Sequence, residues 1–215
     1  MSNNLRSSVI RLAHANPSLR PHLLPLLTKT AAVEVNVPGK HILDNATVFG
    51  KAVVSGRAKV YDDAKVFGYP EVSGDAKVYA KAKVYDDATV FGSAHVYGTA
   101  EVYDNANVYD DAMVYGNAHV SGGAKVYGGA KVYGGATVSG GEVYGDAKVY
   151  GDAKVYGGAN VKDNARVYGD AKVSGRATVY GDADISGTAI ITGGNWDGSE
   201  GRITKGKWMS PGVPA

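Results

Sequence analysis

The chain repeats a six-residue unit of the form Ala-Lys-Val-Tyr-Gly-Asp along most of its length, as in AKVYGDAKVYG at Ala147–Gly157. The aliphatic position of each unit, here called the anchor, recurs every six residues from Val48 to Val138 and again from Val143 to Ile191. One five-residue step separates the two runs. A period of six that persists for about 150 residues is typical of a solenoid, in which each coil stacks on the one before.

The residue types within the unit indicate one short strand followed by one tight corner. Alternation in A-K-V-Y directs Ala and Val to one side of a strand and Lys and Tyr to the other. Gly followed by Asp, Asn or Gly suits a corner, because these residues tolerate left-handed backbone angles. Alanine stands two residues before the anchors, with Pro70 and Gly141 as the exceptions. The pattern therefore predicts a narrow core of small and β-branched side chains shared by all coils.

The number of units in one coil stays open at this level. Serine follows the anchor at two positions 18 apart, Ser55 and Ser73, which favours coils of three units. The stretch VYDDA recurs at intervals of 24, beginning at Val60, Val84 and Val108, which fits coils of two units or a gene duplication. The two patterns point to different coil sizes.

Several units pair an aliphatic residue with a small residue four positions later, as Val60 with Ala64 and Val149 with Ala153. In this respect residues 42–191 resemble the hexapeptide-repeat left-handed β-helix proteins. The form A-x-V-[YS]-G-[DNG] resembles a bacterial and phage subgroup of repeat solenoids, because Tyr, Phe or Ser stands where the wider family often has Gly. The resemblance implies an all-β fold, a single-stranded parallel β-helix that is left-handed and triangular with 18 residues per coil.

Residues 1–33 differ from the repeat, since they hold four basic residues and no acidic residue. Apolar residues at helical spacing, interrupted by prolines, predict a short helical segment that residues 34–41 link to the first coil. The segment resembles a short N-terminal attachment module of phage proteins. It is either a cap over the first coil or a docking module. The residues expected to form its contact surface are Leu5, Arg6, Val9, Arg11, Leu12, Arg20, Leu23 and Leu27.

Residues 192–215 break the repeat. A solenoid needs caps because its ends expose unpaired strand edges and an open core. Trp196, Ile203, Trp208 and Met209 are therefore expected to fold over the last coil, in preference to forming a ligand pocket.

The repeat offers few candidates for catalysis or metal binding. His95 and His119 take the outward position of the unit, and on a three-sided coil a separation of 24 residues places them on adjacent faces. We regard them as weak candidates for metal ligands. No insertion longer than the unit occurs between Val48 and Ile191, whereas enzymes on this scaffold extrude loops to build pockets. The sequence therefore predicts no catalytic residue, no metal site and no cofactor.

Aromatic residues occupy one position of the unit. Except for Tyr69, every tyrosine directly follows an anchor, and so do the phenylalanines. The rings either stack between coils or form a stripe that meets a partner or a glycan. The tyrosines that represent this stripe are Tyr61, Tyr79, Tyr103, Tyr127, Tyr150 and Tyr168.

Charge and hydropathy limit the partners. The net charge is +2 and the repeat contains no block of like charges, so no nucleic-acid partner is expected. No apolar run reaches the roughly 18 residues of a membrane span. The sequence predicts a non-enzymatic structural rod in the cytoplasm, or in a virion if the protein comes from a phage. Its expected partner is itself, as a homo-oligomer, or a larger assembly reached through residues 1–33. The alternatives are a trimeric acyltransferase with a site between subunits, and a carbohydrate-binding module.

Overall fold

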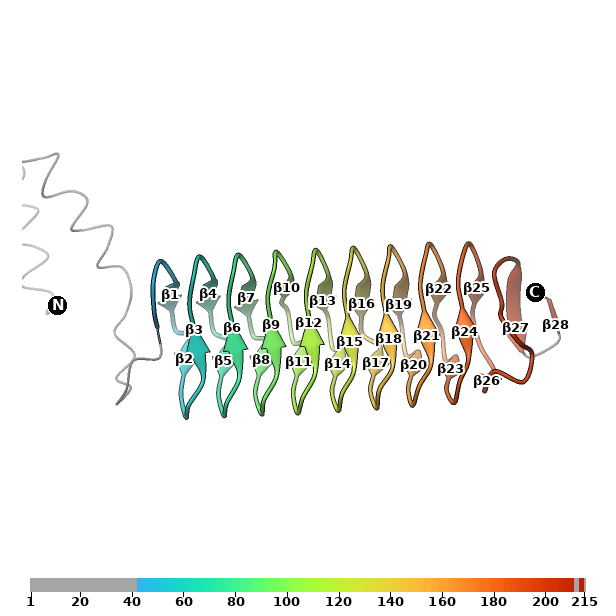
Figure 1. Ribbon diagram of the computed structural model, residues 1–215, viewed down its shortest axis with the longest axis horizontal. Helices are drawn as coiled ribbons and strands as arrows, with labels where there is room; N and C mark the ends of the chain where they lie inside the picture. Colours follow the sequence, from blue (N-terminus) through green and yellow to red (C-terminus); the bar gives the residue numbers. More distant parts are fainter. Residues whose placement is uncertain (1–41, 211–212, 215) are drawn as a thin grey trace, which may run out of the picture.

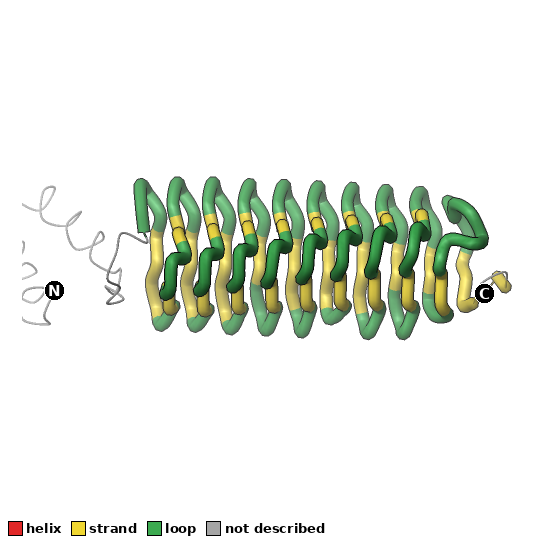
Figure 2. Tube along the Cα trace, turned by 60° about the horizontal axis from the view of Figure 1, so that its bottom comes forward, coloured by secondary structure: helices red, strands yellow, loops and turns green. Residues whose placement is uncertain are grey.

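The computed structural model describes residues 42–210 and 213–214, and it is a parallel β-solenoid (Figure 1). Successive strands of the chain fall in three sheets in turn, and each strand pairs with the strand three places later. Figure 2 shows the strands aligned along the rod with the loops at its corners. The predicted all-β, three-sided parallel solenoid is confirmed. Its left-handed sense stays a prediction, and the helical segment predicted within residues 1–33 lies outside the described residues.

The three sheets differ in length. Sheet I has 11 strands: β1 (Thr47–Gly50), β4 (Lys65–Gly68), β7 (Lys83–Asp86), β10 (Glu101–Val102), β13 (His119–Ser121), β16 (Thr137–Ser139), β19 (Lys154–Tyr156), β22 (Lys172–Val173), β25 (Ile190–Ile191), β27 (Lys207–Ser210) and β28 (Val213–Pro214). Sheet II has nine: β2 (Val53–Val54), β5 (Glu71–Val72), β8 (Thr89–Val90), β11 (Asn107–Val108), β14 (Lys125–Val126), β17 (Glu142–Val143), β20 (Asn160–Val161), β23 (Thr178–Val179) and β26 (Asn195–Trp196). Sheet III has eight: β3 (Lys59–Val60), β6 (Lys77–Val78), β9 (His95–Val96), β12 (Met113–Val114), β15 (Lys131–Val132), β18 (Lys148–Val149), β21 (Arg166–Val167) and β24 (Asp184–Ile185).

The strand register fixes the coil at 18 residues. Val48 lies opposite Val66, and the same offset recurs in all three sheets. The three copies of VYDDA begin in three different sheets, with Val60 in sheet III, Val84 in sheet I and Val108 in sheet II. A spacing of 24 therefore moves the pattern one face further around the rod at each step, and it does not measure a coil.

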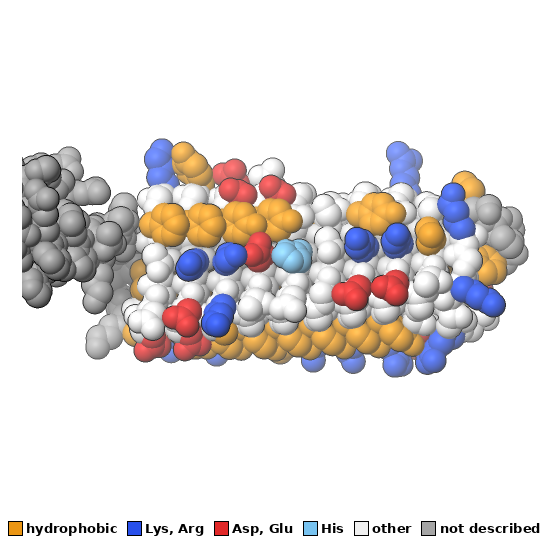
Figure 3. Space-filling view, turned by 90° about the horizontal axis from the view of Figure 1, so that it is seen from above, with side chains coloured by type: hydrophobic (Ala, Val, Ile, Leu, Met, Phe, Trp, Pro, Cys, Tyr) orange, Lys and Arg blue, Asp and Glu red, His pale blue; other side chains and the backbone are white. Residues whose placement is uncertain are grey.

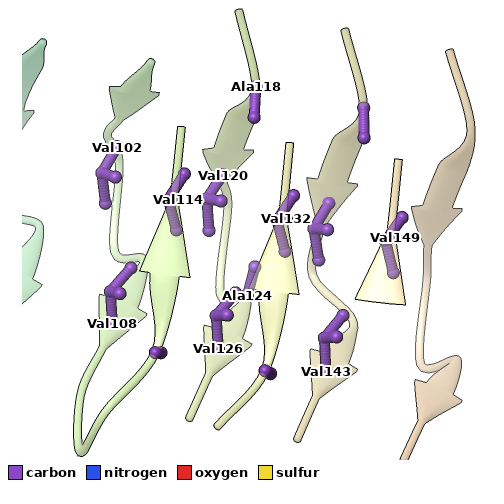
Figure 4. Packing of buried hydrophobic residues seen from close by; sticks show 14 of the residues in the cluster. Val102, Val108, Val114, Ala118, Val120, Ala124, Val126, Val132, Val143 and Val149 are labelled. Atoms are coloured by element: carbon purple, nitrogen blue, oxygen red, sulfur yellow. The ribbon is translucent and has the colours of Figure 1, made fainter. Parts of the chain in front are cut away.

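The anchors and their alanines form one continuous core. Figure 4 shows Val102, Val108 and Val114, from three successive strands, with their side chains turned into the interior. These valines and Ala118 are fully buried. Because burial of a valine side chain contributes about 1.5 kcal/mol or more, each coil is held mainly by the contacts of its anchors with the coils on either side. The predicted core is confirmed.

Left-handed backbone angles define the corners. Gly98 has a φ of 75°, and a Cβ there would lie 2.9 Å from the backbone nitrogen of Gly116 in the next coil. Asp110 also has a positive φ, of 56°, and its Oδ2 accepts a hydrogen bond of 3.2 Å from the backbone N–H of Gly128. This contact helps to offset the cost of a non-glycine residue at the corner. The same bond occurs in the pairs Asp62–Ala80, Asp104–Gly122 and Asp163–Gly181.

The five-residue step is accommodated by Gly141, which occupies the position of the missing alanine. The residue is buried, and a Cβ on it would lie 2.9 Å from the carbonyl oxygen of Ala159 and 3.0 Å from Val155 Cγ1. Across the step the register offset is 17, as in the pairing of Val126 with Val143. The stacking of the coils continues on both sides of it.

Residues after Ile191 add an irregular turn to the rod. Trp196 lies opposite Val179 in sheet II, and Trp208 lies opposite Ile191 in sheet I. Trp196 is fully buried and meets Trp208 edge to face, with ring centroids 6.1 Å apart. The two tryptophans thus lie over the last regular coil, as the sequence predicts. The expectation for Met209 is wrong: its side chain is 60% exposed, because it alternates outward from Trp208 in the same strand.

Candidate interaction surfaces

The aromatic residues form three ladders along the rod. The longest runs beside sheet III, where neighbouring tyrosine rings are 4.8–4.9 Å apart and within 5° of parallel. It consists of Tyr61, Tyr79, Tyr97, Tyr115, Tyr133, Tyr150 and Tyr168. The ladder of sheet I is Phe49, Phe67, Tyr85 and Tyr103, and that of sheet II is Phe91, Tyr109, Tyr127 and Tyr144. The predicted stacking between coils is confirmed.

The six tyrosines predicted to represent one stripe are divided among these ladders. Tyr61, Tyr79, Tyr150 and Tyr168 belong to sheet III. Tyr103 ends the ladder of sheet I, and Tyr127 lies within that of sheet II.

Stacking determines what the ladders present to solvent. In the interior of a ladder both faces of each ring are covered by its neighbours, so the ring edges and hydroxyl groups are what remain. Burial raises the pKa of the Tyr115 phenol, with smaller contributions from Tyr133 and Tyr97. Burial, together with the charge of Glu142, raises the pKa of Tyr127 to about 12. The phenols are therefore neutral hydrogen-bonding groups at ordinary pH.

The two histidines lie on different sheets. His95, in β9, meets the ring of Tyr79 edge to face at 6.1 Å, and burial followed by the charge of Lys77 lowers its pKa. His119, in β13, lies 3.9 Å from a carboxylate oxygen of Glu101. The structure does not bring the pair together. Within residues 42–210 and 213–214, no group of three His, Asp or Glu side chains is placed to hold a metal ion.

Two three-residue clusters were not predicted. Glu101 Oε1 accepts a bond of 2.7 Å from Lys83 Nζ, and its Oε2 accepts one of 3.0 Å from the Tyr85 hydroxyl. The bond from Lys83 is the main reason why the pKa of Glu101 is lowered. Lys125, Tyr127 and Glu142 repeat the arrangement in sheet II. Once the coil size is known, the signal is a glutamate one coil after a Lys-x-Tyr unit.

The outer face of sheet I carries the most open groove, of about 670 Å³. Two rows of charge run along it: the acidic row is Asp152 and Asp170, and the basic row is Lys154 and Lys172. Figure 3 looks onto this side, where acidic and basic side chains form adjacent rows. The remaining lining residues are Gly135, Thr137, Thr188 and Ile190.

Two segments match a known repeat family. Residues 82–98 and 106–122 match the model of the YdcK beta solenoid repeat. Each segment spans one strand of every sheet, β7 to β9 in the first and β11 to β13 in the second. The chain is thus similar over these segments to a β-solenoid repeat, which supports the predicted resemblance at that level. No curated protein and no solved structure matches the chain.

The residues predicted to form the N-terminal contact surface, from Leu5 to Leu27, lie outside the described residues. Among the residues that are described, no helix has the length and hydropathy needed to cross a membrane.

Proposed function

We propose that the chain is a structural rod that presents its repeated faces to copies of itself or to a larger assembly. The assembly would be a filament in the cytoplasm, or a virion if the protein is of phage origin. In this role the rod supplies length, stiffness and regularly spaced side chains, and it performs no catalysis.

The observation that carries the proposal is the unbroken register from Val48 to Ile191. Catalytic pockets need side chains held by irregular loops, because a concave, largely enclosed site is hard to build on a flat repeated face. In the described solenoid each corner has the length of one unit, apart from the shortened step at Gly141. The grooves are correspondingly open and lined by outward residues of the repeat.

The first turn supports attachment through the N-terminal segment. Ile42, Phe49 and Val53 are 38%, 37% and 44% exposed, so apolar surface gathers at the end of the rod that residues 1–41 precede. The opposite end carries the buried Trp196. The proposal assigns Leu5, Val9 and Leu12 to contacts made at the exposed end.

The ladders bear on the carbohydrate-binding alternative. Aromatic residues bind sugars through free ring faces, whereas the inner rings of each ladder have neighbours on both faces at about 5 Å. This argues for the structural role and against the carbohydrate-binding module.

The proposal is tested by light scattering on the full chain and on a triple variant, Leu5→Ser, Val9→Ser and Leu12→Ser. We expect the full chain to have several times its monomer mass of 22.3 kDa. A monomeric triple variant with an unchanged circular dichroism spectrum would assign assembly to the N-terminal segment. A compact trimer in both cases, with acyl transfer from an acyl-thioester donor, would replace the structural rod with the acyltransferase alternative.

A further inference from the structure

We propose that two copies of the chain pack side by side and parallel through sheet I, with the acidic row of each copy against the basic row of the other. The partner is therefore a second copy of this chain. The inference rests on the proposed function and specifies the face, the orientation and the pairing of charges.

The charges of the groove lack opposite partners within the rod. Among the described residues, Asp152, Asp170, Lys154 and Lys172 form no ion pair, whereas Lys83 on the same sheet is paired with Glu101 at 2.7 Å. Lys154 and Lys172 lie directly opposite each other in neighbouring strands. Like charges in this position destabilise a sheet. A partner that places the opposite charge over each row removes this cost.

The order of the rows selects a parallel arrangement. Each aspartate precedes its lysine by two residues, so the rows run along the rod, side by side on the same face. A two-fold axis parallel to the rod and midway between the rows places Asp152 against the partner's Lys154. At the next level it places Asp170 against the partner's Lys172. A two-fold axis across the rod would instead set acid against acid, so the charges specify parallel copies with both N-terminal segments at the same end.

The rest of sheet I is compatible with this pairing. Near the N-terminal end, Asp63 would face the partner's Lys65. Lys81 would face the partner's Lys83, which is the unfavourable level, but Lys83 already carries the carboxylate of Glu101. At about 4.8 Å per strand, the face from β1 to β25 is about 40 Å long. With a width of about 15 Å it buries about 600 Å² per copy, which reaches the lower range of stable interfaces, about 1,200 Å² in total.

Tyr156 provides an apolar contact beside the basic row. In register with Ser139 and one coil before Ser174, it has no ring on which to stack among the described residues. Its side chain is 40% exposed, more than the tyrosines of the ladders. An exposed tyrosine that borders a charged groove is the kind of residue that anchors interfaces.

Charge exchange tests the proposal on the full chain. The acidic variant carries Lys154→Asp and Lys172→Asp, and the basic variant carries Asp152→Lys and Asp170→Lys. We expect each variant alone to lose the sheet I contact and its mass to fall, because like charges then face each other. An equimolar mixture is expected to regain the mass of the wild type, since the acidic variant then faces the basic one. Circular dichroism checks that both variants keep the fold.

A matched control reverses two outward charges of sheet III, Lys131→Asp and Lys148→Asp, and it should leave the mass unchanged. Orientation is read from Thr188→Cys, the single cysteine of the chain, with a nitroxide label. Parallel copies give a short label-to-label distance, and antiparallel copies one longer by roughly the 40 Å length of the face. If the wild type assembles but neither exchange alters its mass, or the mixture stays dissociated, this interface is wrong and the structural rod stands. If the wild type is monomeric at every concentration, both proposals fall.

Discussion

Replacement of a tyrosine inside the long ladder should cost about twice as much stability as replacement at its end. Tyr115 stacks on Tyr97 and Tyr133, with ring centroids 4.8 Å apart on both sides. Tyr168 stacks only on Tyr150, at 4.8 Å, because Ser186 takes the corresponding position in the next coil. Each stacked pair contributes about 0.5–1.5 kcal/mol beyond the area that it buries. We therefore expect Tyr115→Ser to lower the free energy of unfolding by about 1–3 kcal/mol and Tyr168→Ser by about half as much.

Serine is the appropriate replacement because the chain itself places serine at this position, at Ser121 and Ser139, where the two hydroxyl oxygens are 3.4 Å apart. The assay is urea unfolding followed by circular dichroism, with hydrogen exchange at the neighbouring coils to locate the loss. Equal losses for the two variants would mean that stacking between rings is not what holds them. A loss below about 0.5 kcal/mol for Tyr115→Ser would refute the ladder as a stabilising element.

Three further predictions concern the corners and the phenols. Gly98→Ala should cost about 2 kcal/mol or more in urea unfolding, because it combines a positive φ with a Cβ 2.9 Å from backbone, whereas Gly123→Ala, with no atom within 4 Å, should be neutral or stabilising by up to about 1 kcal/mol. Asp110→Ala should lower stability by about 1 kcal/mol through loss of the bond to the Gly128 N–H, and Asp110→Gly by less, because glycine tolerates the corner angle; equal losses would count against the strain argument. The pKa of Tyr127 is raised from 10.0 to about 12, so its contribution to stability is complete below about pH 10 and is lost as pH rises toward 12; phenolate absorbance should report this late titration, and ionisation at the ordinary pKa would contradict it.

The sequence was sufficient for the repeat, the strand and the corner, because each unit carries the same three signals. Ala and Val alternate with outward residues, and Gly or Asp follows at the positive φ, as at Gly98 and Asp110. The coil size required the register, because the interval of 24 between Val60 and Val84 competes with the interval of 18 in the serines.

The ladders, the glutamate clusters and the charged rows all depend on which residues lie 18 apart, so they could be placed only after the coil size was known. Lys154 and Lys172 illustrate this point: 18 residues separate them in the chain, and the register sets them side by side. The turn after Ile191 was obscured because loops of unequal length separate Trp196, Ile203 and Trp208. Even so, each of these residues pairs with an anchor 17 or 18 positions earlier.

Small-angle X-ray scattering on the full chain over a range of protein concentrations tests lateral association of the rods. The forward scattering gives the mass, and the cross-sectional radius separates side-by-side packing from end-to-end packing. We predict a mass that is a multiple of 22.3 kDa, a cross-section wider than that of one rod, and a shift toward the single rod at high salt, because the pairing is electrostatic. A mass of 22.3 kDa with the cross-section of one rod at every concentration would contradict the role proposed for this protein.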